Sequence, residues 1–318
     1  SLAPAAADVL TGAGYQPVYV PAYTTGDGLI DIVRTADPVG ILARMGQVDE
    51  AVFAAAPRLQ VVSKHGAGVD NIDTDAAARR GIPVLNAAGA NAVSVAEQAI
   101  TLMFAVAKKV IALERGLREG RWDKPGFQGR ELAGSVLGLV AFGAIARQTA
   151  RFAKGLGLTV KAYDPYTPAE VFAAEGVEQV QDLDTLITGC DVLSLHCPLT
   201  AATKHLINAD RLAQMKPDAI IINTARGGLI DEAALADALH EGRIFGAGLD
   251  TFAQEPPPAD HPFWSEPRLV LSPHIGGVTT AANLRVGVEA AQGIVDVLAG
   301  RSVSPSRIVN RDKLSISA

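Results

Sequence analysis

Three side chains of complementary chemistry follow short apolar runs in the second half of the chain. Arg226 comes after "AIIINT", Glu255 lies five residues beyond the end of "GAGLD", and His274 directly follows "LVLSP". An arginine can hold a carboxylate through two parallel hydrogen bonds, and a histidine can pass a proton to or from an alcohol oxygen. A carboxylate beside the histidine fixes its tautomer and favours the charged ring. The set predicts proton transfer on a small acid that is held by its carboxylate.

Further candidates stand at other predicted strand ends. His196 begins "HCPLT", His65 lies in "SKHGAGVDNID", and Asp250 closes "GAGLD". In open α/β sheets, ligands bind outside the carboxyl ends of the strands. Three histidines at strand ends exceed what packing needs, although for any one of them a structural histidine remains the alternative.

The stretch "GLVAFGAIAR" is close to the dinucleotide fingerprint G-x-G-x-x-G. The three glycine positions hold Ala141, Gly143 and Ala146, between an expected strand and an expected helix. The second glycine lets the backbone approach a pyrophosphate, and Gly143 keeps that position. Ala146 adds one methyl group at the helix–strand contact. Ala141 is the real departure, because alanine is tolerated there if φ is negative and strained if φ is positive.

An acidic residue is expected about 20 residues after the fingerprint. Asp164 lies in "KAYDPY", and its carboxylate would accept hydrogen bonds from the adenosine ribose and repel a 2′-phosphate. We therefore predict NAD rather than NADP as the cofactor, and hydride transfer between NAD and a 2-hydroxy acid. A strand–turn–helix without a cofactor, followed by a chance aspartate, is the alternative.

Composition excludes several other classes of function. The 318 residues carry a net charge of −6, which offers no electrostatic footprint for nucleic acid. The longest apolar stretch, "AITLMFAVAKKVIAL", is interrupted by Lys108 and Lys109, so no membrane span is expected. The N-terminus lacks the pattern of a signal peptide. Two cysteines, Cys190 and Cys197, do not make a disulfide framework and suit a reducing cytoplasm.

Short apolar runs alternate with helical patterns, which predicts doubly wound α/β architecture with parallel sheets. The expected strands are 59–63, 136–141, 158–164, 191–196, 219–224, 246–250 and 269–273. Near the N-terminus, "APAAADVLTGAG" predicts a helix and "PVYV" (17–20) a strand. No strand precedes that helix, so the first strand of this domain is expected to be missing from the sequence.

The last helical pattern, 279–299, follows a complete nucleotide-binding block and is expected to return to the first domain. The prediction is a substrate domain formed by 1–91 and 279–318, with a nucleotide-binding domain, 92–278, inserted into it. Residues 91–120 predict one long helix that is apolar almost all round. Such a helix is buried in a core or in a subunit interface, and we predict a homodimer interface there.

In order and spacing, these blocks resemble the NAD-dependent D-2-hydroxyacid dehydrogenases, which include phosphoglycerate dehydrogenase and glyoxylate/hydroxypyruvate reductases. The resemblance covers nearly the whole chain through "GAGVDNID", "NAVSVAEQ", "HCPLT", "INTARGGLID", "DTFAQEP" and "SPHIGG". It implies a Rossmann-type NAD-binding domain inserted in a flavodoxin-like substrate domain. It also implies interconversion of a D-2-hydroxy acid and a 2-keto acid. Ala141 and Ala146 depart from the family pattern.

The resemblance assigns roles residue by residue. Arg226 is implied as the substrate-orienting cation, Glu255 as the partner carboxylate and His274 as the acid/base. The substrate is further implied to meet Arg226, His274 and the loop Lys64, His65, Gly66 and Ala67, the loop acting through backbone N–H groups. Asp250 is implied near the nicotinamide carboxamide. The full set implied for the cofactor is Gly143, Ala144, Ile145, Asp164, His196, Cys197, Pro198, Thr203, Thr224, Ala225, Arg226, Asp250, His274, Gly276 and Gly277.

Two alternatives stay open on the sequence. Formate dehydrogenase belongs to the same family but is disfavoured, because that branch is expected to have Gln in place of Glu beside its histidine. A corepressor-like protein that senses NAD(H), with little turnover, is the alternative from a different class. No metal site is predicted. The side chain of the substrate has no motif.

Overall fold

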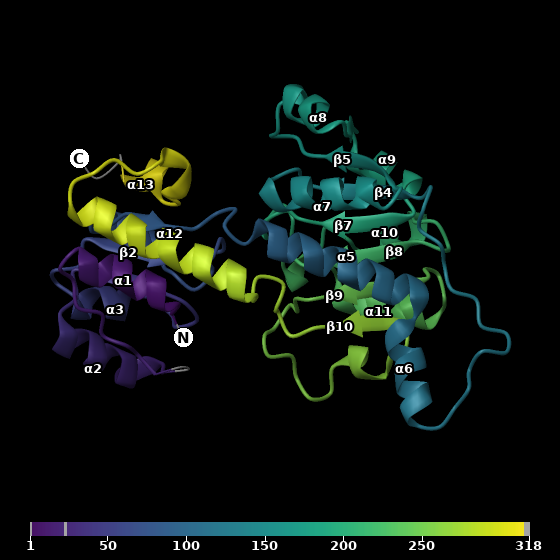
Figure 1. Ribbon diagram of the computed structural model, residues 1–318, viewed down its shortest axis with the longest axis horizontal. Coiled ribbons are helices and arrows are strands. Elements are labelled where there is room, and N and C mark those ends of the chain that lie inside the picture. Colours follow the sequence, from purple (N-terminus) through teal and green to yellow (C-terminus); the bar gives the residue numbers. More distant parts are fainter. Residues whose placement is uncertain (1, 22–23, 315–318) are drawn as a thin grey trace. The chain divides into compact units, whose positions relative to one another are not determined.

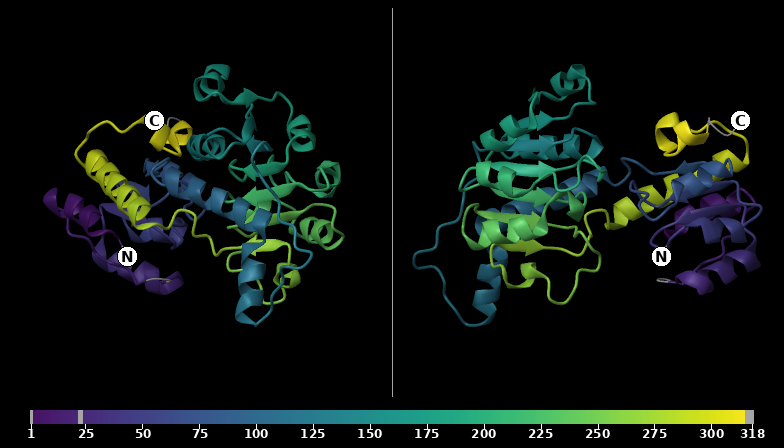
Figure 2. Two further views of the ribbon diagram at one scale, coloured as in Figure 1. Left: turned by 45° about the vertical axis from the view of Figure 1, so that its right-hand side comes forward. Right: turned by 180° about the vertical axis from the view of Figure 1, so that it is seen from behind.

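The structure, a computed structural model, describes residues 2–21 and 24–314. By its internal contacts the chain divides into two compact units, each with a parallel sheet. Unit 1 comprises Ser1–Asn91 and Gly277–Ala318, and unit 2 comprises Ala92–Gly276. Figures 1 and 2 show the strands of each unit with helices packed along them. The predicted α/β class with parallel sheets is confirmed.

The described part of unit 1 holds a three-stranded sheet in the order β1-β2-β3. Its strands are β1 (Gly40–Ala43), β2 (Val61–Lys64) and β3 (Val84–Leu85). Successive residues of β2 face two different cores. Val61 packs in the core with α1 and α12, and Val62 packs in the core with α2, α3 and α4. The helices and the 3-10 turn are α1 (Pro4–Gly12), α2 (Gly26–Ala36), α3 (Glu50–Ala55), α4 (Thr74–Arg79), α12 (Thr280–Leu298), η3 (Pro305–Arg307) and α13 (Arg311–Leu314).

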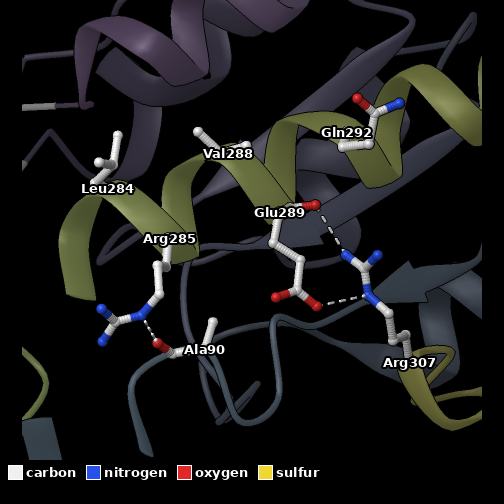
Figure 3. A pocket seen from close by; sticks show the side chains of 7 residues that line it. All are labelled: Ala90, Leu284, Arg285, Val288, Glu289, Gln292 and Arg307. Carbon is white, nitrogen blue, oxygen red and sulfur yellow. Dashed lines mark hydrogen bonds and ion pairs between the residues drawn. The ribbon is translucent and has the colours of Figure 1, made fainter. Parts of the chain in front are cut away.

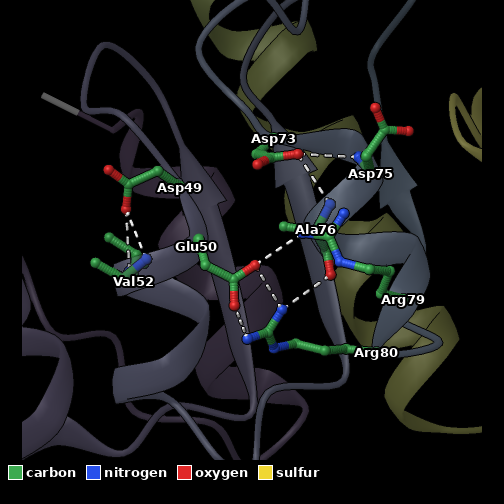
Figure 4. A network of polar contacts seen from close by, with 9 residues as sticks. Asp49, Glu50, Val52, Asp73, Asp75, Ala76, Arg79 and Arg80 are labelled. Carbon is green, nitrogen blue, oxygen red and sulfur yellow. Dashed lines mark hydrogen bonds and ion pairs between the residues drawn. The ribbon is translucent and has the colours of Figure 1, made fainter.

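Two short helices of unit 1 are fixed by carboxylates, as Figure 4 shows. Asp49 accepts from the amides of Ala51 and Val52 at the start of α3, and Asp73 caps α4 in the same way. Such N-caps satisfy helix amides that have no partner within the helix. Glu50 joins the two helices through Arg79 and Arg80, and hydrogen bonds from these arginines lower the pKa of Glu50 to about 2.

Unit 2 has a seven-stranded parallel sheet in the order β10-β9-β8-β7-β4-β5-β6. The chain order reverses between β4 and β7, which is the topological switch point of a doubly wound sheet. The strands are β4 (Val136–Val140), β5 (Thr159–Tyr163), β6 (Glu178–Gln179), β7 (Val192–Leu195), β8 (Ile220–Asn223), β9 (Gly246–Leu249) and β10 (Leu269–Leu271).

Both faces of this sheet are covered by helices. Figure 1 shows α5 and α7 in front of the strands, and the view from behind in Figure 2 shows further helices on the opposite face. Along β8, Ile220 and Ile222 join the core under α5 and α7, whereas Ile221 joins the other core. The helices and 3-10 turns are α5 (Ala92–Lys108), α6 (Val110–Arg118), α7 (Ala144–Gly155), α8 (Ala169–Glu175), α9 (Leu183–Gly189), α10 (Ala209–Gln214), η1 (Gly227–Leu229), α11 (Glu232–His240) and η2 (Pro262–Ser265).

Two sequence predictions about these elements are wrong. Residues 17–20 form no strand, and Val18 and Tyr19 are largely exposed. The long helix predicted over 91–120 is broken at Lys109, whose φ of 50° is left-handed. Most apolar side chains of its first part, α5, are buried in the core of unit 2 itself, including Leu102 and Met103, whereas Val93 is exposed. The surface available to a partner is therefore not the continuous apolar helix that the sequence predicts.

Candidate active site

The predicted functional residues of unit 2 gather at one edge of its sheet. The parallel registers pair Val140 with Leu195, Leu195 with Asn223, and Asn223 with Leu249. The loops that follow β4, β7, β8 and β9 therefore start side by side. They carry the fingerprint turn, the "HCPLT" segment, Arg226 and Asp250. The sheet thus brings together residues that lie more than a hundred positions apart in the sequence.

Glu255 and His274 form a hydrogen-bonded pair at this edge. The distance between Glu255 Oε2 and His274 Nδ1 is 2.7 Å. The other carboxylate oxygen, Oε1, accepts from the Phe252 amide at 3.1 Å. His274 has a φ of 53°, and its side chain is 46% exposed. The carboxylate holds one ring nitrogen, which leaves the opposite nitrogen, Nε2, to face a reactant.

The surroundings of Glu255 favour its ionised form. Partial burial opposes the charge, but the hydrogen bonds from His274 and from the Phe252 amide lower the pKa of Glu255 overall. The positive charges of His274 and Arg226 act in the same direction. Glu255 is therefore a carboxylate at neutral pH, as an orienting partner for a histidine must be.

Arg226 is placed by a close contact between two loops. It stands directly before η1, and its Nη1 donates to the Ala225 carbonyl at 2.7 Å. A Cβ atom on Gly227 would come within 1.9 Å of the Phe252 backbone carbon and 2.2 Å of the Ala253 nitrogen. Only glycine allows this approach, which joins the Arg226 loop to the segment that leads to Glu255.

Asp250 holds the loop that carries His274. This fully buried carboxylate accepts from Ser272 Oγ at 2.5 Å, from the Ile275 amide at 2.9 Å and from the Gly276 amide at 2.7 Å. Ser272 in turn accepts from Gln98 on α5 at 2.9 Å. These contacts flank His274 on both sides. The resemblance implies a cofactor contact for Asp250, and the structure adds this positioning contact, which sequence reasoning missed.

The fingerprint turn has the conformation that is unfavourable for alanine. Ala141 has a φ of +71°, in the left-handed region that favours glycine. Its amide donates to the Tyr163 carbonyl at 2.8 Å. Ala146, by contrast, is fully buried in the core between sheet and helix, so the extra methyl group at the third position is accommodated. The sequence left open whether φ at Ala141 is negative or positive. The structure has the positive φ, which is the strained alternative.

Asp164 fastens the same turn from the next strand. Its carboxylate accepts from the Phe142 amide at 2.8 Å, the Tyr166 amide at 2.9 Å and the Thr167 hydroxyl at 2.9 Å. Burial opposes its charge, but these hydrogen bonds lower the pKa of Asp164 overall. The carboxylate is charged at neutral pH and lies beside the turn.

The start of α7 leaves room for an anion. Gly143, the N-cap of α7, precedes Ala144 and Ile145 and has no side chain to cap the helix, and a Cβ atom on it would meet nothing within 4 Å. The first amides of a helix attract negative charge. Thr224, after β8, has a buried hydroxyl with no hydrogen-bond partner among the described residues. Its neighbour Ala225 donates its amide to Asn223.

The residues directly after β7 are uncharged at neutral pH. His196 is hydrogen-bonded to Ser194 Oγ at 2.9 Å, and burial lowers the pKa of His196 to about 4. Burial raises the pKa of the Cys197 thiol to about 11. Thr203 Oγ1 closes the loop by donating to the Pro198 carbonyl at 2.7 Å. With a neutral ring at pH 7, His196 is unsuited to act as a general acid.

The residues predicted to meet the substrate from unit 1 are tied into their own unit. Lys64 Nζ donates to the Arg44 carbonyl and to Asn71 Oδ1, both at 2.5 Å. The His65 amide donates to the Ala43 carbonyl at 2.9 Å, and the Gly66 amide to the Lys64 carbonyl at 3.0 Å. Within the described residues, no backbone acceptor is paired with the Ala67 amide. Burial, together with the charge of Arg44, lowers the pKa of His65 to about 4.

The last two predicted glycines lie where the chain leaves unit 2. A Cβ atom on Gly276 would come within 2.9 Å of Asp250 Oδ2, and one on Gly277 within 2.8 Å of Asn91 Nδ2. The Gly276 carbonyl accepts from Ser94 Oγ of α5 at 2.6 Å. Both glycines thus have a packing reason in addition to their predicted place near the cofactor.

A separate hollow lies along α12 in unit 1, with a volume of about 560 Å³. Figure 3 shows Arg285 bound to the Ala90 carbonyl and Arg307 bound to Glu289 on its wall. None of the predicted site residues lines it. Across the residues that the structure describes, no cluster of metal-ligating side chains is found, and no helix is long and apolar enough to cross a membrane.

Comparison with known proteins places this geometry in a family. Residues 100–276 match the family profile "D-isomer specific 2-hydroxyacid dehydrogenase, NAD binding domain". Hydroxypyruvate reductase of Thermotoga maritima is 41% identical over 84% of this chain and 87% of its own length. D-3-phosphoglycerate dehydrogenase of Methanocaldococcus jannaschii is 41% identical over 89% of this chain and 54% of its own. The TT0316 protein of Thermus thermophilus has a TM-score of 0.84 at 33% identity, with 97% of each chain covered.

The chain therefore belongs to the D-isomer specific 2-hydroxyacid dehydrogenases, and unit 2 contains the family's NAD-binding domain. It spans about half the length of the phosphoglycerate dehydrogenases that it matches.

Proposed function

We propose that this protein interconverts a D-2-hydroxy acid and a 2-keto acid, with NAD(H) as the redox partner. The observation that carries the proposal is the Glu255–His274 pair at 2.7 Å, with the charge of Arg226 close enough to favour ionised Glu255. These are the acid/base, its orienting carboxylate and the carboxylate-binding cation that the reaction needs.

The residues at the sheet edge fit NAD. Gly143 leaves open space at the start of α7, where a pyrophosphate would lie against helix amides. Thr224 offers a buried hydroxyl that lacks a partner within the described chain. Asp164 offers a charged acceptor for the ribose hydroxyls and would repel a 2′-phosphate, which supports NAD over NADP. When bound there, NAD⁺ would accept a hydride from the hydroxy acid, and NADH would donate one to the keto acid.

The chain's own residues would supply orientation and the proton. Arg226 would hold the substrate carboxylate through its planar guanidinium. In the reducing direction, protonated His274 would donate from Nε2 to the keto oxygen, while Glu255 keeps Nδ1 hydrogen-bonded and stabilises the charged ring. Within unit 1, the loop of Lys64, His65, Gly66 and Ala67 would offer a carboxylate chiefly the Ala67 amide, because the His65 and Gly66 amides already donate to carbonyl groups of that unit.

The test is oxidation of NADH with glyoxylate, hydroxypyruvate and pyruvate as acceptors. The wild-type protein should turn over at least one of them, and His274→Ala should lower that rate by about 10²–10⁴-fold. His240→Ala, at an exposed position on α11, is the matched control and should leave the rate unchanged. NADH binding without turnover on any acid would instead support the sensing alternative, which the relatives do not favour.

We further propose a homodimer whose interface lies on α6 and the segment that follows it. The exposed apolar side chains there are Val110, Ile111, Leu117, Trp122 and Phe127, and Figure 1 shows this part extending away from the sheet of unit 2. Light scattering should give twice the mass of the chain, and Leu117→Glu should give the mass of one chain. A monomeric wild-type protein at micromolar concentration would contradict the proposal.

Two buried free cysteines support a cytoplasmic location.

A further inference from the structure

Asn223, the last residue of β8, uses both polar atoms of its side chain, one as a hydrogen-bond donor and one as an acceptor. Its side chain is fully buried. Nδ2 donates to the Arg226 carbonyl at 2.8 Å, and Oδ1 accepts from the Ala225 amide at 3.0 Å. One partner is a carbonyl and the other an amide, so the orientation of the side-chain amide is fixed. A carboxylate could not donate to the Arg226 carbonyl, and the shorter serine side chain offers one polar atom in place of two.

These contacts close the turn that presents Arg226. The turn runs from Thr224 to Arg226 between the end of β8 and η1. Its far side is fixed by Gly227, which packs directly on the backbone of Phe252 and Ala253. The backbone carbonyl of Asn223 accepts from the Asp250 amide at 2.9 Å, which ties the same point to the next strand end. Asn223 is thus bonded at once to the Arg226 loop and to the strand end that leads to Asp250.

We propose that Asn223 is the positioning residue for Arg226 and acts on substrate binding through that guanidinium. The inference rests on the proposed function, in which Arg226 holds the substrate carboxylate. Without the Nδ2 donor, the Arg226 carbonyl keeps only its hydrogen bond from the Leu229 amide at 3.2 Å, and the turn opens. Displacement of a substrate-binding group by about 1 Å can lower a rate by about 10²-fold.

Two variants test the role of the side-chain amide. Asn223→Asp is isosteric but replaces the donor with an acceptor that faces the Arg226 carbonyl, and Asn223→Ser is smaller and uncharged. Both should lower kcat/KM for the best keto acid by about 10²-fold, with most of the loss in KM. Ile222→Val is the matched control, because it removes one buried methyl group from the same strand without touching the turn. It should lower stability slightly and leave KM unchanged.

A double-mutant cycle separates positioning from general damage. If Asn223 acts through Arg226, Asn223→Ser should change kcat/KM by less than about threefold in an Arg226→Ala background. Independent, multiplicative losses would overturn the proposal, and so would a KM in both Asn223 variants no higher than that of Ile222→Val.

A crystal structure of Asn223→Ser gives a readout that does not depend on turnover. The proposal expects the 224–226 turn and the guanidinium to move relative to the wild-type structure. An unmoved turn would overturn it, even if the wild-type protein proved inactive on every acid tested. Absence of wild-type turnover would count against the proposed function alone.

Discussion

Replacing Ala141 with glycine should remove backbone strain from the fingerprint turn. The φ of +71° puts the alanine Cβ atom close to the following carbonyl oxygen. This conformation costs an L-residue roughly 1–2 kcal/mol, and glycine adopts it without that cost. The neighbouring contacts keep the turn where it is, because the Ala141 amide is bonded to Tyr163 and the Phe142 amide to Asp164. The strain is therefore present in the folded protein whether or not a cofactor is bound.

Two smaller effects oppose the gain. Glycine adds conformational entropy to the unfolded chain, worth about 0.4–1 kcal/mol. Loss of a half-buried methyl group costs roughly a further 0.4 kcal/mol. The balance is a change in the free energy of unfolding between a loss of about 0.4 kcal/mol and a gain of about 1.2 kcal/mol. An alanine with ordinary helical geometry behaves differently: Ala173→Gly, at an exposed position on α8, should cost about 1 kcal/mol.

Urea unfolding followed by tryptophan fluorescence measures the free energy of unfolding of unit 2, which contains Ala141 and Ala173. The chain has two tryptophans, Trp122 and Trp264, and both lie in unit 2. Ala141→Asn should behave like glycine, because asparagine tolerates left-handed φ, and Ala141→Val should be strongly destabilising. If Ala141→Gly lowered stability as much as Ala173→Gly, the turn would not be strained and the reasoning would be refuted. NADH titration of the same variants shows whether relief of strain also tightens binding.

Three further predictions follow from the charged groups. Asp164→Ala should narrow the preference for NADH over NADPH in fluorescence titrations, and wild-type protein that bound NADPH as tightly as NADH would contradict the role of Asp164. Glu255→Gln should move the high-pH limb of keto-acid reduction toward lower pH, since a neutral amide no longer stabilises the charged ring of His274; an unmoved limb would argue against the pair. His65 and His196, both with pKa values lowered to about 4 by burial, stay neutral in the folded protein, whereas an unfolded histidine takes up a proton below about pH 6.5. Stability should therefore be fully present above pH 6.5 and fall as the pH drops toward 4, by up to about 1.4 kcal/mol per pH unit for each histidine. His196→Gln should flatten this dependence in urea unfolding and His240→Gln should not; a flat wild-type profile would exclude the effect.

The sequence predicts best the strands that are buried on both faces. The run at Ile220–Asn223 is apolar throughout because helices cover both sides of it. By contrast, β1 (Gly40–Ala43), β3 (Val84–Leu85) and β6 (Glu178–Gln179) are short or partly exposed, and their sequences are not distinctive. Residues 17–20 have the composition of a strand, but they pair with no strand among the described residues, and such pairing depends on the tertiary structure.

Local sequence also could not decide the backbone conformation at two positions. At Lys109 the left-handed φ ends α5, although the helical pattern of the residues continues beyond it. At Ala141 the sign of φ depends on hydrogen bonds to Tyr163 and, through the next residue, to Asp164. Both partners of Ala141 belong to the following strand and its end. The fingerprint alone therefore predicts a turn but not its strain.

The residues expected to touch the reactants stand on loops that are held by buried or half-buried polar side chains. Asp250 accepts backbone amides on the far side of His274, Asn223 closes the turn before Arg226, and Asp164 binds the Phe142 amide of the fingerprint. For Asp164 this means that a substitution has two effects, because it removes a group expected to meet the ribose and also releases the turn. Release of the turn should weaken the binding of NADH and of NADPH alike. Loss of the carboxylate should strengthen only the binding of NADPH, because it removes repulsion of the 2′-phosphate. The ratio of the two dissociation constants, rather than either one alone, therefore isolates the contact that selects the cofactor.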